Sequence, residues 1–320
     1  MTITAVTLTT FAQKGLREQL SDTIYNISPE DTPITSMVAK TRAKGVLNEW
    51  MTDSLGAVDT SNAQLEGDDI TTYPTTAQPI RVSNVQQISR KLLAVSGTAE
   101  EVEKAGRKSE INYQTAMRGA EMKRDIESII MENQSANAGS ATTARTTATL
   151  GAWLKTNVDK ASDGSNPVYP AGSPAQRTDG TKRAFTETIL KSAISKLWTS
   201  GGQCKYLFTG PFNKAAVSAF AGLATKVFNL TAPKPAATVA TADVYVSDFG
   251  TLEVHPNRFM RERDAYLIDP AYIEIQHLRP FRRKDLAETG DASKVMLLVE
   301  WGLKVRQEAG LALCADLTTA

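Results

Sequence analysis

Side chains that could carry catalytic chemistry are few in this sequence, and their spacing fits no common catalytic motif. The chain has two histidines, His255 and His277, and two cysteines, Cys204 and Cys314. Each histidine lies in a strand-like segment without a second ligand at metal-binding spacing, so we expect both to be structural or surface residues. The sequence also lacks a phosphate-binding loop, an H-E-x-x-H pair, a C-x-x-C pair and a G-x-S-x-G elbow. No catalytic residue, cofactor site or metal site is therefore predicted.

Two short motifs resemble functional ones and are better explained as turns. Asp248-Phe249-Gly250 spells the metal-binding tripeptide of protein kinases, but the kinase H-R-D loop and glycine-rich lid are absent. With a strand-like segment on either side, this tripeptide predicts a hairpin turn. The acidic run 66–69 lacks the alternating ligand spacing of a calcium loop, which favours a solvated turn. An enzyme remains an alternative that no motif supports.

Composition excludes several other classes. The 320 residues are 41% hydrophobic and 22% charged, as in an ordinary folded protein of one large or two medium domains. A net charge of +1 gives no overall attraction to nucleic acid or to anionic membranes. No window approaches the ~18 to 20 apolar residues of a membrane span, and the first residues do not form a secretory signal. Two cysteines suit a reducing cytoplasm, and a disulfide between them stays open.

The clearest charge pattern is an acidic segment that is distant in sequence from a basic one. Between Lys44 and Arg81 there is no lysine or arginine. The acidic residues of this segment are Glu49, Asp53, Asp59, Glu66, Asp68 and Asp69. The densest basic stretch is Arg279, Arg282, Arg283 and Lys284, with Arg258, Arg261 and Arg263 upstream. Two interpretations are open: two solvated faces, or an acidic finger that docks on a neighbouring subunit's basic surface and weakens with added salt.

The N-terminal third predicts an arm, a short helix and a β-excursion. Residues 1–12 are unpatterned, and Leu16, Leu20 and Ile24 form the apolar stripe of a short helix. Capping residues before prolines predict a turn at 27–32 and a helix from Pro33 to about Lys40. Residues 46–51 and 79–96 have strand composition, and a long irregular tip separates them. Such a two-stranded excursion cannot bury its own faces, so it needs a partner surface.

A long helix with much of its surface exposed to solvent is predicted after the β-excursion. Thr98 and Glu101 form a capping box, no proline follows until Pro167, and helical patterning holds over 98–133. At 1.5 Å per residue this helix is about 50 Å long. Gly106 costs about 1 kcal/mol against alanine inside a helix, which suggests a bend or a close approach.

The remaining sequence alternates helix and strand signals and predicts an α+β protein. Residues 134–184 are loop-dominated, with one short segment able to pack, 151–158. A helix is expected from Thr186 to the glycines at 201–202, a buried strand at 204–210 and a helix at 211–222. A linker at 231–242 then leads into a β-rich tail.

The order of these parts resembles the Hong Kong 97-type major capsid protein of tailed bacteriophages. The amino-acid sequence itself resembles a branch of that superfamily found in podovirus-like phages. The resemblance covers nearly the whole chain and is weakest at 134–184 and 222–242. The segments that carry it are NISPEDTPITSMV, RVSNVQQISRKLLAVSGTAEEVEKAGRKSEINYQ, MKRDIE, VYVSDFGTLEVHPNRFM and KVMLLVEWGLKVRQEAG.

This resemblance implies a domain plan and a role for the long helix. Residues 1–43 correspond to the N-terminal arm and 44–96 to the extended β-hairpin loop that reaches across an adjacent subunit. The peripheral domain comprises 97–204 and 291–320 and includes the spine helix 98–133. The axial domain, whose loops meet at capsomer centres, comprises 205–290. Gly106 then becomes a candidate spine hinge between compact and expanded shells.

The resemblance also implies function and partners. Such proteins form homo-pentamers and homo-hexamers that close an icosahedral head in the host bacterial cytoplasm and contact packaged double-stranded DNA non-specifically on the inner face. A portal and a cement or decoration protein are expected partners; a membrane is not. No lysine occurs over 45–80, so the founding member's lysine–asparagine crosslink is not carried over. The chain shows no long charged helical segment before the arm, which implies a separate scaffolding protein. The alternative is an encapsulin-like compartment of the same fold.

Overall fold

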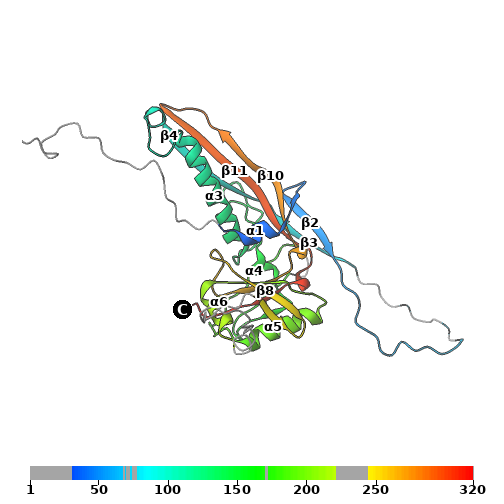
Figure 1. Ribbon diagram of the computed structural model, residues 1–320. Coiled ribbons are helices and arrows are strands. Elements are labelled where there is room, and N and C mark those ends of the chain that lie inside the picture. The colour runs from blue at the N-terminus through cyan, green and yellow to red at the C-terminus, as the bar shows by residue number, and fades with distance from the viewer. Residues whose placement is uncertain are drawn as a thin grey trace, which may run out of the picture.

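The computed structural model describes residues 31–67, 69, 73, 78–169, 172–220 and 244–319. An elongated unit of sheet and helix stands on a second lobe, and a long hairpin arm extends away from both (Figure 1). The arm predicted at 1–12 and the helix with Leu16, Leu20 and Ile24 lie outside the described residues, as does the linker 231–242.

The first described elements match the expected order. Helix α1 (Pro33–Met37) begins at the proline, as predicted, and ends at Met37 because strand β1 (Ala39–Arg42) follows directly. Strands β2 (Leu47–Thr52) and β3 (Ile80–Val85) form the base of the hairpin arm. They pair antiparallel from Leu47 opposite Val85 to Thr52 opposite Ile80, so the tip lies between Thr52 and Ile80.

A four-stranded sheet forms the elongated unit, in the order β1-β10-β11-β4. Its long members are β4 (Gln87–Ser96), β10 (Ile273–Asp285) and β11 (Ala292–Val305). The segment 79–96, predicted as one strand of the extended loop, is in fact divided at Gln86. Its second half pairs with β11 along its full length, so residues 87–96 belong to this sheet and the extended loop ends sooner than expected.

The predicted continuous helix over 98–133 is wrong in its first third. Helix α2 (Gly97–Glu101) is one short turn, and α3 (Glu110–Ile130) begins only after an eight-residue break. Gly106 lies in that break with φ +75°, a left-handed conformation that favours glycine. The α2 cap is the Ser96 hydroxyl, which accepts from the Ala99 amide at 3.2 Å, in place of the predicted Thr98.

Side chains on either side of the break, Glu100 in α2 and Ser109 just before α3, stabilise the interruption. The Glu100 carboxylate accepts from the Glu110 amide at 2.9 Å and from the Ile111 amide at 3.3 Å. The Ser109 hydroxyl accepts from the Asn112 amide at 3.2 Å. These bonds satisfy amides at the start of α3 that would otherwise lack partners, which makes a new helix start at Glu110 favourable.

The second lobe contains a six-stranded sheet in the order β5-β12-β9-β6-β8-β7. Its strands are β5 (Val158–Asp159), β6 (Tyr206–Thr209), β7 (Val244–Ser247), β8 (Gly250–Pro256), β9 (Ala265–Ile268) and β12 (Ala312–Cys314). Helices α5 (Glu187–Thr199) and α6 (Pro211–Ser218) supply further buried side chains to this lobe. The strand expected at 204–210 and the helix after Pro211 are thus confirmed, and Asp248 and Phe249 form the predicted hairpin turn.

The sheets divide the chain differently from the predicted domain boundaries. Strand β10, expected in the axial domain 205–290, pairs with β11 in the four-stranded sheet. Strands β5 and β12, expected in the peripheral domain, lie in the six-stranded sheet. The single-turn helices η1 (Pro270–Tyr272) and η2 (Glu308–Gly310) stand where the chain passes between the sheets. Because β10 pairs antiparallel with β11 over most of its length, residues 273–285 lie in the four-stranded sheet and not in the second lobe.

The region 134–184 is loop-dominated as expected, yet parts of it are buried. The short helix α4 (Leu150–Trp153) is fully buried, in agreement with the packing segment predicted there. Asn84 is buried beside this loop, and its Nδ2 donates to the Leu303 carbonyl at 2.6 Å while its Oδ1 accepts from the Ala148 amide at 2.8 Å. Both cysteines are free thiols. Within the described residues no helix has the length and apolarity needed to cross a membrane.

Candidate inter-subunit surfaces

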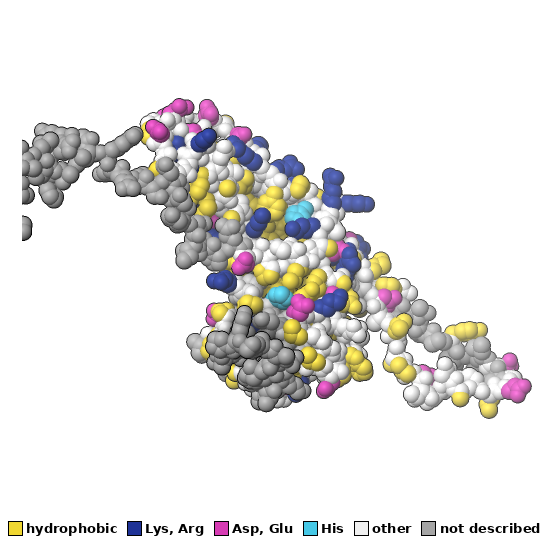
Figure 2. Space-filling model, viewed as in Figure 1, with side chains coloured by type: hydrophobic (Ala, Val, Ile, Leu, Met, Phe, Trp, Pro, Cys, Tyr) yellow, Lys and Arg dark blue, Asp and Glu magenta, His cyan; other side chains and the backbone are white. Residues whose placement is uncertain are grey.

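The hairpin arm exposes large apolar side chains that nothing in its own subunit covers. Leu55 is 99% exposed and Val58 is 91% exposed. Among the described residues of the arm, the exposed large apolar side chains are Leu47, Met51, Leu55, Val58, Leu65, Tyr73 and Ile80. A two-stranded ribbon has no core, and a run of exposed apolar residues of this kind marks an interaction surface. The arm, visible as yellow atoms far from the body in Figure 2, is therefore built to be covered by another surface.

The acidic residues of the predicted finger follow the same arm. Glu49 lies in β2 and forms an ion pair with Arg81 of β3, so it is neutralised within the arm. Asp53, Asp59, Glu66 and Asp69 are exposed beyond the strands, and Asp68 lies outside the described residues. Two of these carboxylates also accept local backbone bonds, Asp53 from the Ser54 amide and Asp59 from the Ser61 amide. The arm is thus apolar and acidic together, and sequence reasoning saw only the acidity.

Aromatic packing anchors the base of the arm to the body. The Trp50 indole Nε1 donates to the Val305 carbonyl at 3.0 Å, and its ring lies 5.3 Å from the ring of Trp153. Trp153 contacts Tyr169 edge-on at 5.4 Å, and the Lys304 ammonium lies 5.8 Å from the Trp50 ring. These contacts fix the direction in which the arm leaves the subunit.

The predicted basic stretch lies on β10 and is only partly free. Arg279 Nε contacts Glu300 Oε2 at 2.6 Å, so this residue is tied to the neighbouring strand β11. Arg283 pairs with Asp285 at 3.1 Å, while Arg282 and Lys284 are exposed. Strand β1 pairs with β10 only over Glu274–His277, which leaves the distal half of β10 as an open sheet edge. Dark blue side chains line this part of the elongated unit in Figure 2.

Two of the upstream arginines do not belong to any basic surface, which corrects the prediction. Arg261 contacts Asp264 at 3.2 Å, and Arg263 contacts Asp316 at 2.9 Å. Arg177, whose side chain is fully buried, lies 3.4 Å from Asp316 and 3.6 Å from Asp264. Burial raises the pKa of Asp264 to about 6. The physical reason for the error is that buried carboxylates, Asp264 nearby in sequence and Asp316 more than 50 residues away, neutralise these arginines, while Arg258 stays exposed.

A buried carboxylate that the sequence analysis missed holds the start of the described chain. Glu127 of α3 is fully buried and accepts three hydrogen bonds. The donors are the Ile34 amide at 2.9 Å, the Thr35 amide at 2.8 Å and Asn257 Nδ2 at 2.7 Å. Its position beside Ile126 and Ile130 on the apolar face of α3 was the available signal. Glu127 therefore fixes the place where α1 meets α3.

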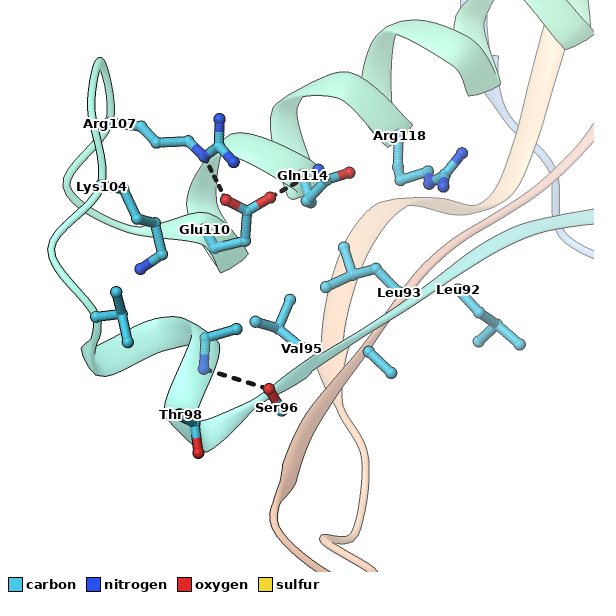
Figure 3. A pocket seen from close by; sticks show the side chains of 13 residues that line it. Leu92, Leu93, Val95, Ser96, Thr98, Lys104, Arg107, Glu110, Gln114 and Arg118 are labelled. Atoms are coloured by element: carbon cyan, nitrogen blue, oxygen red, sulfur yellow. Dashed lines mark hydrogen bonds and ion pairs between the residues drawn. The ribbon is translucent and has the colours of Figure 1, made fainter. Parts of the chain in front are cut away.

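A groove lies at the far end of the elongated unit, between β4, α2 and the start of α3 (Figure 3). It encloses about 790 Å³, and Leu92 and Val102 on its wall are 53% and 58% exposed. Lys104 Nζ donates to the Glu100 carbonyl at 2.8 Å, and Arg107 pairs with Glu110. Gly106 lies in the turn beside this groove. The groove thus combines an apolar wall with a rim of charged side chains, Lys104, Arg107, Arg118 and Glu110.

Neither histidine is placed at a metal site. His255 packs against the Phe208 ring at 5.7 Å and contacts Glu253 at 3.3 Å. His277 is half-buried on β10, where burial, and to a lesser extent Lys40, lowers its pKa. Across the described ranges no group of three or more histidine, cysteine or acidic side chains could hold a metal ion.

Comparison with known proteins gives consistent matches along the whole chain. The family model of the SU10 major capsid protein matches residues 2–318. The major capsid protein of Escherichia phage Phieco32 is 28% identical, over 92% of this chain and 93% of that protein. The cyanophage A-1(L) capsid subunit superposes with a TM-score of 0.69 at 14% identity, covering 97% of this chain and all of that one. The SrpI encapsulin of Synechococcus elongatus superposes at 0.52 with 10% identity, covering 96% and 94%.

Proposed function

Because the chain belongs to the SU10 major capsid protein family, we propose that its subunits are joined by seating the arm of each copy on the body of the next. The chain is a phage major capsid protein with the Hong Kong 97-type fold, as its sequence predicted, and it assembles with itself in the virion. The similarity to the SrpI encapsulin is a similarity of fold and does not indicate a shared function.

The exposed apolar arm is the observation that carries this proposal. The arm extends away from both lobes of its own subunit (Figure 1), and the 99% exposure of Leu55 and 91% exposure of Val58 show that its own body does not cover them. Burying apolar surface is worth roughly 25 cal/mol per Å², which makes a second copy's surface a favourable cover. An arm that leaves one subunit and lands on a different patch of the next forms a heterologous contact, and such contacts generate rings when the rotation between successive copies closes. Pentamers and hexamers are the rings we infer.

Charge adds selectivity to this contact. The exposed acids Asp53, Asp59, Glu66 and Asp69 favour a basic receiver, and Arg282 and Lys284 on the open edge of β10 are one candidate. The contact is then weakened by added salt, because exposed charges are screened within about 10 Å at 0.1 M ionic strength. Reversal of Arg282 and Arg283 to glutamate tests this receiver, and unchanged assembly yield counts against it.

Arm variants test the proposal as a whole. Leu55→Asp combined with Val58→Asp places charges where apolar burial is required, whereas Thr60→Asp adds a charge nearby without removing an apolar side chain. Size-exclusion chromatography and negative-stain microscopy should show rings or shells for the parent chain and for Thr60→Asp, and a soluble subunit near 34.6 kDa for the double variant. Shells formed by Leu55→Asp/Val58→Asp with normal yield contradict arm docking.

The finer assembly roles are part of the same proposal. We assign residues 47–85 to the extended loop, the four-stranded sheet with α3 to the peripheral domain, and the six-stranded sheet to the axial domain. The arm has no lysine over 45–80, so the shell is held without a lysine crosslink from this loop. A separate scaffolding protein, a portal and a decoration protein act with the chain during assembly in the host cytoplasm. Packaged double-stranded DNA then contacts the inner face without sequence preference.

The spine hinge at Gly106 also remains a proposal, now with a different geometry. The positive φ of Gly106 between α2 and α3 supports a pivot between two helices, where the sequence suggested a bend within one. Shell expansion that proceeds at the parent rate in Gly106→Ala argues against the hinge.

A further inference from the structure

One loop of the region 134–184 contacts both the second lobe and the base of the arm, and we call it the brace. It comprises residues 161–169 and 172–181. Its two sides are joined by backbone bonds between Ser165 and Thr178, which each donate to the other's carbonyl at 3.0 Å. The brace has a foot, where its ends meet the second lobe, and a tip, where Gly172 meets β3.

The tip of the brace pairs with the arm through its backbone. The Gly172 amide donates to the Arg81 carbonyl at 2.9 Å, and the Ser83 amide donates to the Gly172 carbonyl at 3.1 Å. The Ser83 and Ser173 hydroxyls lie 3.0 Å apart. Gly172 has φ +82°, a conformation that favours glycine. The tip therefore pairs with the edge of β3 that β2 leaves free.

The foot of the brace is held by a single carboxylate that follows β12. Asp316 is fully buried; its Oδ1 accepts from the Gly180 amide at 2.8 Å, and its Oδ2 accepts from the Ala161 amide at 3.1 Å. These amides lie on opposite sides of the brace, so Asp316 ties the two sides together. Arg263 and Arg177 also contact this carboxylate, at 2.9 and 3.4 Å. Asp316 has φ +60°, a left-handed conformation that its surroundings hold in place.

The position of Asp316 depends on the segment that carries it. Residues 311–317 are fully buried, and their strand β12 lies between β5 and β9 in the six-stranded sheet. If this segment leaves the sheet, the Gly180 and Ala161 amides lose their acceptors. Buried amides without acceptors are costly, so the foot of the brace is stable only while the segment is inserted.

We propose that the brace couples the second lobe to the arm, so that the arm keeps its direction only while residues 311–317 are inserted in the sheet. Trp50 anchors β2 to the body, and the brace anchors β3. The two states are a docked brace, bonded at foot and tip, and a released brace, bonded at neither. A subunit with a released brace does not assemble; this consequence rests on the proposed arm docking, whereas the coupling is a property of one subunit.

Hydrogen exchange of the soluble chain, read by mass spectrometry, tests the coupling. Asp316→Gly removes the carboxylate and leaves a residue that accepts φ +60° without strain. The Ser83 and Gly172 amides, bonded across the contact between arm and brace, should then exchange at least about tenfold faster than in the parent. Tyr245→Ala is the matched control, because Tyr245 is buried on β7, the edge strand of the same sheet furthest from β12. This control should leave both amides at the parental rate.

A coupling between the two ends of the brace must also act in the opposite direction. Gly172→Ala strains the tip through its φ of +82° alone, since the space beside Gly172 is open. The Gly180 amide at the foot should then exchange faster as well. Parental exchange of Ser83 in Asp316→Gly, or of Gly180 in Gly172→Ala, overturns the coupling. Asp316→Asn keeps one acceptor oxygen and replaces Asp316→Gly if the glycine variant does not fold, with faster exchange of Ser83 again expected.

Assembly separates this inference from the proposal on which it rests. The assembled fraction of Asp316→Gly in size-exclusion chromatography should fall at least about fivefold below that of the parent. Parental assembly by a chain whose arm amides exchange faster overturns the control of assembly and leaves arm docking intact. Shells formed by Leu55→Asp/Val58→Asp overturn arm docking and leave the coupling, measured in the soluble chain, intact.

Discussion

Replacing Glu127 by glutamine removes one of the two buried carboxylate oxygens that accept hydrogen bonds. The attachment of α1 to α3 should weaken as a result. Oε1 accepts from the Ile34 amide and from Asn257, and Oε2 accepts from the Thr35 amide. The glutamine oxygen keeps the first two bonds, and its NH₂ group then faces the Thr35 N–H, which is left without an acceptor. The opposite orientation of the amide leaves two donors unpaired and is worse.

The magnitude follows from these contacts. An orphaned buried donor costs about 1–3 kcal/mol, and two bonds that lose charge assistance cost about 1 kcal/mol each. The neutral amide recovers part of the cost of burying a carboxylate, so we expect a net loss of about 2–3 kcal/mol. Glu127→Ala orphans all three donors and should cost about 5 kcal/mol.

Two measurements on the soluble chain check this expectation. Urea unfolding reports the global loss, with Glu103→Gln as the control, because Glu103 is exposed and should change stability by less than about 0.5 kcal/mol. Limited trypsinolysis after Lys40 and Arg42 reports local release of α1. A local loss of about 2.8 kcal/mol corresponds to roughly a hundredfold faster cleavage. If Glu127→Gln matches the parent in both assays, the carboxylate does not anchor this segment.

Three further comparisons, made with five variants, test other parts of the fold. The folded-state pKa of Asp264, about 6, lies above its ordinary value, so this residue favours the folded state below about pH 4 and loses that contribution as pH rises to about 6. The unfolding free energy of the parent relative to Asp264→Asn should therefore fall between pH 4 and 6; a flat difference contradicts the assignment. Gly106→Ala should cost about 1 kcal/mol because φ is +75°, and Gly119→Ala, inside α3 with open space around it, should gain about 1 kcal/mol. The same sign for both glycines would refute the helix break. Trp50→Ala should cost about 2 kcal/mol and speed proteolysis of the arm, whereas the more exposed Trp198→Ala should do neither.

Local signals predicted most elements well. The proline at the start of α1, the glycine-bounded helix α5 and the turn at Asp248-Phe249 all depend on residues within a few positions, so the sequence specified them. Alternating strands predicted the extended loop and its need for a partner surface. The family resemblance, carried by strings spread over the chain, was confirmed by the family match.

The predictions that differed from the structure depended on contacts that sequence patterns do not specify, between residues near to or distant from each other in sequence. The helix break at Gly106 arises because Glu100 and Ser109 cap a new helix start, a choice that i, i+4 charge pairs do not decide. Arg261 and Arg263 looked like surface charges until Asp264, Asp316 and Asp179 were found beside them. Apolar residues on the arm gave no sign of exposure, because a strand sequence does not state which of its faces is covered.

The sequence by itself determined the class of protein, the order of its elements and the absence of recognisable catalytic motifs, since periodicity, turn residues and composition act over short distances. Only the tertiary structure decided which sheet each strand joins and which charges remain free. It also brought Glu127 to the Ile34 amide, 93 positions away in sequence. These choices rest on surface complementarity and on burial that leaves no polar group unpaired. Both are properties of the folded subunit and, at the arm, of its neighbours as well.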